Sequence, residues 1–206
     1  MATSASLSDP TLVLATANRA KGRELAELLA GLPYRIRDLS EFPTVVLPPE
    51  GEQSYTENAL AKARAVTAAT GLVALGDDSG IEVDALGGRP GVLSARYGGE
   101  GLSDPDRNAL MLRELAGVAP ARRIARYRAV IAVTMPDGRE ATAEGTVEGF
   151  ITESPRGTGG FGYDPIFYYP PFGLTLAEVS PVAKHAVSHR ARAMAQARAL
   201  LRRWAS

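Results

Sequence analysis

The stretch LGDDSGIEVDALGGRPGVLSARYGG, residues 75–99, places four carboxylates within eight positions, with glycines before, among and after them. These acids are Asp77, Asp78, Glu82 and Asp84. The apolar run just before them, residues 72–75, is typical of a short buried strand. Because open α/β sheets bind ligands at the carboxyl ends of their strands, we expect Asp77 and Asp78 to lie at such an end.

Adjacent carboxylates repel each other unless a cation lies between them. A pair such as Asp77 and Asp78, kept side by side, therefore favours a hard divalent cation such as Mg²⁺. The alternative is an acidic surface turn, because Asp-Ser-Gly at residues 78–80 also suits a turn. The rest of the chain has to decide between these interpretations.

Size and composition limit the class of protein. A length of 206 residues suits one domain, and residues 1–10 are expected to form a disordered leader rather than a signal peptide. The 23 basic residues balance the 23 acidic ones, so net charge attracts neither nucleic acid nor membrane. Cysteine is absent, which excludes disulfides and zinc–thiolate sites. No window approaches the roughly 18 apolar residues of a membrane span, so we expect a soluble, cytoplasmic protein.

Lysine is rare in this chain. Only three of the 23 basic residues are lysines, and the other 20 are arginines. The lysines are Lys21, Lys62 and Lys184. A compact, mobile ammonium suits a phosphate, which makes each of these positions a candidate for phosphate binding.

A strand is predicted at residues 11–15, followed by a polar turn and a helix over residues 19–30. A helix that starts after a strand presents free N–H groups and a positive dipole to an anion. Thr16 and Asn18 can add donors there, and Lys21 can reach back to a phosphate. The alternative is that Thr16 and Asn18 are ordinary helix caps.

A second helix is predicted over residues 55–70. Asn58 and Lys62 are four residues apart and so share one face, which could point into the same cleft as Lys21. Glu50 ends the proline-rich loop before this helix and is expected at the mouth of that cleft. A helix with a solvated polar stripe is the alternative.

The middle of the chain predicts a helix and a hairpin to which we assign no catalytic residue. A helix from about Ser103 to Gly117 is assigned to packing, with no chemistry. The β-prone runs 122–134 and 140–147, joined by Pro-Asp-Gly, predict a hairpin that projects as a second lobe or a dimer contact.

Residues 157–162 formally match the GxGxxG fingerprint of dinucleotide sites. That interpretation fails, because Asp164-Pro165 prevents the helix that the fingerprint requires. The loop instead offers Phe161 as a stacking face for a flat ligand, with Asp164 behind it. A tight turn with a buried phenylalanine is the alternative.

The last segment, residues 184–206, holds five arginines, both histidines and no acid. Ser188 could cap a helix whose start would gather Lys184, His189 and Arg190 around an anion. A nucleic-acid-binding helix is the alternative, which the neutral charge of the whole chain disfavours.

In chain order these motifs resemble the Ham1/RdgB-type non-canonical purine nucleoside triphosphate pyrophosphatases, the inosine triphosphate pyrophosphatase family. The resemblance is carried by TANRAK (16–21), Glu50 with ENALAKA (57–63), GDDSG to SARY (76–97), GTGGFGYDPIF (157–167) and K-x-x-x-SHR (184–190). It implies a single α/β domain over residues 1–206, elongated and two-lobed, with a central mixed sheet flanked by helices and a protruding hairpin lobe. It also implies a homodimer, Mg²⁺ dependence, and hydrolysis of ITP, dITP or XTP to the monophosphate and pyrophosphate.

The resemblance also implies roles for individual residues. Asp78 matches the catalytic base and, with Glu50, the metal ligands. The phosphate-side positions are matched by Thr16, Asn18, Lys21, Lys62 and Ser79. The base and ribose positions are matched by Phe161, Gly162, Tyr163, Asp164, Lys184, His189 and Arg190, of which His189 or Arg190 is the expected donor to the 6-oxo group.

Two other functions remain open at this point. One is a Maf-like pyrophosphatase acting on pyrimidine or modified nucleotides, and the other is a nucleotide-binding sensor without turnover. The P-loop signature GxxxxGK[S/T] is absent, so the P-loop class is disfavoured.

Overall fold

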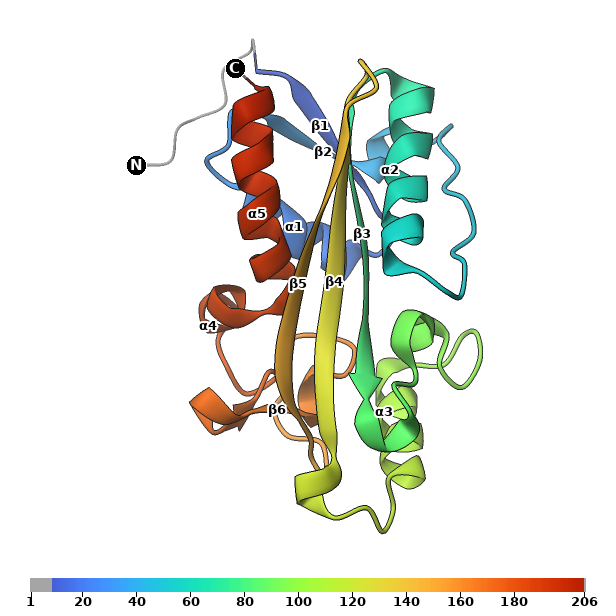
Figure 1. The fold of residues 1–206 in the computed structure, drawn as a ribbon, viewed down its shortest axis with the longest axis vertical. Coiled ribbons are helices and arrows are strands. Elements are labelled where there is room, and N and C mark those ends of the chain that lie inside the picture. The colour runs from blue at the N-terminus through green and yellow to red at the C-terminus, as the bar shows by residue number, and fades with distance from the viewer. Residues whose placement is uncertain (1–8, 206) are drawn as a thin grey trace. The chain divides into compact units, whose positions relative to one another are not determined.

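The computed structural model describes residues 9–205 as an α/β protein with a mixed seven-stranded sheet in the order β2-β1-β3-β4-β5-β6-β7 (Figure 1). The strands are β1 (Thr11–Ala15), β2 (Arg35–Asp38), β3 (Val73–Val83), β4 (Ile124–Thr134), β5 (Glu140–Ile151), β6 (Phe167–Tyr169) and β7 (Leu174–Thr175). The helices are α1 (Arg19–Leu29), α2 (Tyr55–Thr70), α3 (Asp104–Glu114), α4 (Pro181–Val187) and α5 (His189–Trp204). The expected mixed sheet flanked by helices is therefore confirmed.

The chain divides into two compact units. Among the described residues, the first comprises 9–78, 129–145 and 190–205, and the second comprises 79–128 and 146–189. Each unit has its own apolar core. The first core includes Leu12, Leu25, Leu75, Ile131 and Leu201. The second core includes Ile81, Tyr97, Met111, Tyr127 and Ile166.

Two expectations concern the N-terminal segment and membrane-spanning helices. Residues 1–8 of the expected leader lie outside the described residues, whereas the Pro10 carbonyl already accepts a hydrogen bond from Arg35 N at 2.9 Å. Between residues 9 and 205, none of the helices is both long and apolar enough to span a membrane.

Helices α1 and α2 form where the sequence predicts them. Asn18 caps α1, and its Oδ1 accepts hydrogen bonds from the backbone of Ala20 and Lys21. Ser54 caps α2 in the same way, and Gly71 ends that helix in the left-handed conformation with φ 67°. Glycine adopts this conformation without the steric cost of a Cβ, so the helix ends at the predicted residue.

Strand β3 is longer than predicted, and this changes the setting of the acidic pair. The predicted strand stops at Leu75, whereas β3 continues to Val83 and contains Asp77 and Asp78. It pairs in parallel with β1 as far as Ala15 and Gly76. The two acids therefore lie within a strand, directly beyond the carboxyl end of its parallel neighbour.

Alternation along β3 sends the two acids to opposite faces of the sheet. Leu75 belongs to the core that holds α1 and α5, and a Cβ on Gly76 would meet the Ala59 carbonyl of α2. Asp77 therefore shares a face with Leu75, and Asp78 shares a face with Gly76. The expected side-by-side carboxylate pair is not formed.

Two further expectations about the later elements need correction. The hairpin expected to protrude instead supplies β4 and β5 as interior members of the sheet, with Met135 and Arg139 closing its turn. The C-terminal helix is preceded by α4, which sequence reasoning missed. Ser188 ends α4 in extended conformation before α5 begins, so Lys184 lies in the last turn of α4 rather than at a helix start.

Candidate active site

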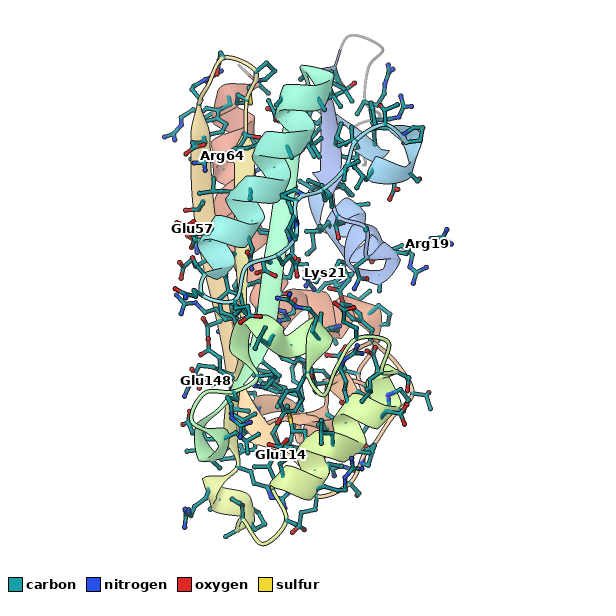
Figure 2. The ribbon with its side chains drawn as sticks, turned by 90° about the vertical axis from the view of Figure 1, so that its right-hand side faces the viewer. Arg19, Lys21, Glu57, Arg64, Glu114 and Glu148 are labelled. Atoms are coloured by element: carbon teal, nitrogen blue, oxygen red, sulfur yellow. The ribbon has the colours of Figure 1, made fainter. Side chains whose placement is uncertain are left out.

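The first unit gathers most of the predicted phosphate and metal residues into one group, which we call the acid–lysine cluster. Its members are Lys21, Glu24, Glu50, Asn58, Lys62, Asp77, Asp78 and Arg190. They come from α1, the loop before α2, α2, β3 and α5. Figure 2 shows that Arg19 projects outward at the start of α1, whereas Lys21 lies against the rest of the unit.

Asp78 is bound by the face of α2 that the sequence singles out. Asn58 Nδ2 donates to Asp78 Oδ2 at 2.8 Å, and Lys62 Nζ lies 3.9 Å from Asp78 Oδ1. Lys62 Nζ also lies 2.6 Å from Glu50 Oε1. The prediction that Asn58 and Lys62 share a functional face with Glu50 is therefore consistent with their contacts.

Asn58 also fixes the loop that carries Glu50. Its Oδ1 accepts from Gly51 N at 2.8 Å, and its Nδ2 donates to Gly51 O at 3.1 Å. One buried amide thus ties the residue after Glu50 to Asp78. The sequence indicated the face of Asn58 but not this clamp.

Asp77 is bound on the opposite face. Lys21 Nζ lies 2.9 Å from Asp77 Oδ2, and Arg190 Nε donates to Asp77 Oδ1 at 3.0 Å. Arg190 Nη1 also contacts Glu24 Oε2 at 2.5 Å, and only 1% of Arg190 is exposed. Arg190, expected beside the base, therefore has its guanidinium on two acids of the first unit. Glu24 was missed, although its i,i+3 position relative to Lys21 is a signal that could have found it.

The pKa values of Asp77 and Asp78 are shifted in opposite directions. Burial alone would raise the pKa of Asp77, but the charges and hydrogen bonds of Arg190 and Lys21 hold it well below its usual range. Burial raises the pKa of Asp78 above its ordinary value, and the charges of Lys62 and Lys21 offset this only in part. Two titratable neighbours whose pKa values are pushed apart are typical of a site that transfers protons.

The remaining predicted phosphate residues occupy local structural positions. Thr16 is buried, and its Oγ1 accepts from Asn18 N at 3.2 Å. Asn18 caps α1 through its Oδ1. Its Nδ2 donor takes no part in these two cap hydrogen bonds. Ser79 occupies a half-buried position in β3, as the first residue of the second unit.

The two predicted metal ligands can be tested against the chemistry of Mg²⁺. Within residues 9–205, no group of three or more His, Cys, Asp or Glu side chains is placed to hold a metal ion. Glu50 and Asp78 instead approach the same Lys62 ammonium, so a cation already lies near both acids. Mg²⁺ commonly takes one or two carboxylates and completes its shell with substrate phosphates and water. Glu50 and Asp78 therefore fit a Mg²⁺ ion that binds together with the phosphates of a substrate.

The second unit holds the predicted base-side residues, which centre on residues 157–164, here called the Phe161 loop. Asp164 is buried, and its Oδ2 accepts from Phe161 N at 2.9 Å and from Lys184 Nζ at 2.6 Å. The Lys184 ammonium lies 4.7 Å from the centroid of the Phe161 ring. These three predicted residues are therefore brought together. The loop leads into a 3₁₀ turn and β6, which confirms that it is no dinucleotide fingerprint.

Gly162 and Tyr163 continue the loop. Gly162 has φ +62°, and its N–H donates to Asp104 Oδ2 at 2.7 Å. Its carbonyl accepts from Asn108 Nδ2 at 3.1 Å. Tyr163 is buried and donates its hydroxyl to the Ser94 carbonyl at 2.8 Å. Asp104 and Asn108 belong to α3, to which the sequence assigned no chemistry.

His189, the first residue of α5, stacks on an aromatic ring. Its ring lies 4.6 Å from that of Tyr127, with 7° between their planes, and only 4% of His189 is exposed. Ser188 beside it is 1% exposed. Stacking fixes the plane of the imidazole, which suits a group that has to present a donor in one direction.

The chain is similar to known proteins along most of its length. The model of the Ham1 family matches residues 12–200. The dITP/XTP pyrophosphatase of Geobacter sulfurreducens is 50% identical over 184 residues, which cover 89% of this chain and 92% of that protein. That of a Thermus thermophilus strain is 50% identical over 190 residues, covering 92% of this chain and 89% of that protein.

Solved structures show the same likeness. A HAM1 protein from Coxiella burnetii is similar with a TM-score of 0.82 and 39% identity, covering 93% of this chain and 98% of that one. The Staphylococcus aureus Ham1 protein has a TM-score of 0.82 and 36% identity, covering 93% of this chain and 97% of that one. The resemblance expected from the motifs is confirmed, and this chain belongs to the Ham1 family.

Proposed function

We propose that this protein hydrolyses ITP, dITP and XTP to the monophosphate and pyrophosphate, with Mg²⁺ as its cofactor. The observation that carries the proposal is the setting of Asp78: a buried acid tied by Asn58 and Lys62 to the loop of Glu50. Relatives that are 50% identical bear the name dITP/XTP pyrophosphatase, which supports the substrate class.

The hydrolytic step is assigned to the first unit. Asp78, whose pKa is raised by burial, accepts a proton from the water that attacks the α-phosphorus. The bond from the water oxygen to phosphorus forms as the bond from the α-phosphorus to the bridging oxygen breaks, and pyrophosphate leaves. Mg²⁺, when bound by Glu50 and Asp78, neutralises charge on the triphosphate.

Phosphate binding is assigned to two lysines and three polar side chains. Lys21 and Lys62 supply ammonium groups to the triphosphate, and Thr16, Asn18 and Ser79 supply polar donors. Asp77 remains ionised and holds Lys21 and Arg190 in place rather than binding the metal.

The base is assigned to the second unit. Phe161 stacks on the purine, and Lys184 with Asp164 fixes the loop that carries Phe161. Gly162 and Tyr163 shape the same loop. Of the two donors expected for the 6-oxo group we favour His189, because the Arg190 guanidinium is held by Asp77 and Glu24. A donor facing the 6-oxo group disfavours adenine, whose amino group is itself a donor.

The test is pyrophosphate release from a panel of purine and pyrimidine triphosphates, with Mg²⁺ present and with Mg²⁺ removed by a chelator. We expect ITP, dITP and XTP to be hydrolysed at least about a hundredfold more efficiently than ATP, because a mispaired polar group costs a few kcal/mol. Chelation should abolish turnover. Preference for pyrimidine or modified nucleotides would support the Maf-like alternative, and binding without product would support a sensor.

The proposal also includes an oligomeric state and a location in the cell. The family resemblance implies a homodimer, which light scattering would reveal as twice the 21.7 kDa mass of the chain. The proposed substrates belong to the nucleotide pool of the cell, so we place the enzyme in the cytoplasm.

A further inference from the structure

Helix α3 holds the Phe161 loop by two hydrogen bonds to Gly162. Asp104 Oδ2 accepts the Gly162 N–H at 2.7 Å, and Asn108 Nδ2 donates to the Gly162 carbonyl at 3.1 Å. Asp104 and Asn108 are four residues apart and therefore lie on one face of the helix. Both backbone polar groups of Gly162 are thus held by the first turns of α3.

Packing alone does not account for an asparagine at position 108. Asn108 is 3% exposed, and Met111 and Leu115, which follow on the same helix, belong to the apolar core of the second unit. Within the described residues, Asn108 Oδ1 is buried without a hydrogen-bond partner. A buried acceptor that is left over destabilises the folded state, and leucine at this position would avoid that cost. The amide is explained by its bond to Gly162.

The loop is held from a second direction by Asp164. This carboxylate accepts the Phe161 N–H at 2.9 Å, so the N–H groups of Phe161 and Gly162 are each bound by a different aspartate. Gly162 has φ +62°, a conformation that glycine adopts without strain. With both amides fixed, the backbone that carries the Phe161 ring has little freedom to move.

We propose that Asp104 and Asn108 are positioning residues that set the place of the Phe161 ring, and thereby the affinity and selectivity for the purine base. They act through the Gly162 peptide and touch no reacting atom. The inference rests on the proposed function, in which Phe161 stacks on the base. It gives α3 a role in substrate choice.

The test compares Asn108→Leu and Asp104→Ala with a matched control, Asp106→Ala. Asp104 and Asp106 are both exposed acids in the first turn of α3, so both substitutions remove the same favourable interaction with the helix dipole. Asp106 binds Ser103 at the helix start, whereas Asp104 binds Gly162 and also pairs with Arg107 at 3.3 Å within the helix. Asn108→Leu leaves that ion pair in place, so an effect that Asp104→Ala and Asn108→Leu share, and that Asp106→Ala lacks, reports on the loop.

We expect both test variants to raise KM for ITP about tenfold while kcat changes less than about threefold, because base affinity is lost and the hydrolytic groups are untouched. The preference for ITP over ATP should fall in parallel. Inhibition by inorganic tripolyphosphate, which probes phosphate binding alone, should stay unchanged. Hydrogen exchange of the peptide covering residues 157–164 should be faster in Asp104→Ala than in Asp106→Ala.

Three outcomes would overturn the inference. The first is a KM and an ITP preference in Asn108→Leu and Asp104→Ala that equal those of Asp106→Ala. The second is an equal loss of every constant together with the melting temperature, which is what a merely structural role produces. The third is unchanged hydrogen exchange in the loop. Failure of the proposed function itself would appear separately, as absence of purine triphosphate hydrolysis by the unsubstituted protein.

Discussion

At the scale of single residues, the main finding is that adjacent aspartates have separate partners and separate chemistry. Asp77 contacts Lys21 and Arg190, whereas Asp78 contacts Asn58 and Lys62. The sequence identified both acids as important because of their density and their glycines. It could not separate them, because the face that each one occupies depends on how far β3 extends.

Substitutions at the two aspartates should therefore differ in what they damage. Asp78→Asn is expected to lower kcat roughly a hundredfold to ten-thousandfold with little change in the melting temperature, because it removes the proposed general base and keeps the side-chain shape. Asp77→Asn is expected to cost about 3 kcal/mol of unfolding free energy, because it leaves the buried Arg190 without one of its charge partners.

Steady-state kinetics and chemical denaturation of both variants would check this division. Near-normal hydrolysis by Asp78→Asn at saturating Mg²⁺ would contradict the catalytic assignment. Equal destabilisation by the two variants would contradict the separate roles.

At the scale of elements, close contact between α2 and β3 sets the position of Asp78, the proposed general base. A Cβ on Gly76 would collide with the backbone carbonyl of Ala59 in α2, so glycine allows the helix to approach the strand. This approach brings Asn58 and Lys62 within reach of Asp78, two residues further along the strand. The glycine is thus part of the geometry of the site.

Gly76→Ala is expected to destabilise the protein by about 1–3 kcal/mol and to lower activity, because a backbone carbonyl cannot move aside as a flexible side chain can. Gly22→Ala is the matched control. Gly22 lies within α1, and its added Cβ would have its nearest neighbour at 3.5 Å, so this change should stabilise the helix by roughly 0.5–1 kcal/mol. Thermal melting of both variants measures the difference, and equal melting temperatures would refute it.

The elements also show what sequence patterns can predict. Helix α2 was predicted to the residue, because a serine cap and a left-handed glycine mark its ends locally. Strand β3 was predicted too short, because Asp77, Asp78 and the nearby glycines are typical of a turn, and only pairing within the sheet keeps them extended. Helix α4 was missed, because its seven residues carry little periodicity.

At the scale of the whole molecule, the two kinds of basic residue are used differently. Several arginines form surface pairs, such as Arg37 with Glu41, Arg64 with Glu140 and Arg139 with Asp137, whereas Arg190 is buried in the acid–lysine cluster. All three lysines belong to the residues predicted to bind the nucleotide. The scarcity of lysine was therefore a useful guide to candidate residues, but it could not show which acid each lysine would contact.

Exchange of lysine and arginine should lower activity at a predicted nucleotide-binding position and leave it unchanged at an exposed one. Lys62→Arg keeps the charge but puts a larger planar group where a buried ammonium contacts Glu50, so kcat/KM should fall at least about tenfold. Arg113→Lys, at an exposed position of α3, should leave kcat/KM unchanged. Kinetics with ITP would test both, and full activity of Lys62→Arg would show that charge alone is sufficient.

The balanced charge of the chain gives a second expectation at this scale. With 23 basic and 23 acidic residues, we expect no salt-dependent retention on immobilised DNA, because nothing in the net charge attracts phosphate backbones. Recovery of the protein in the flow-through of the DNA column at low salt would agree with this expectation. Retention that weakens steadily as salt rises would revive the nucleic-acid-binding alternative for the basic C-terminal helix.

The alternation of side chains in β3 also limits how the gene can change. Inserting or deleting one codon between Gly76 and the start of the strand would turn each aspartate to the opposite face of the sheet, away from the partners that it now contacts. A change of two codons would return each acid to its own face, but about 7 Å further along the strand and still out of reach of those partners. We therefore expect neither change of length in this part of β3 to preserve the acid–lysine cluster.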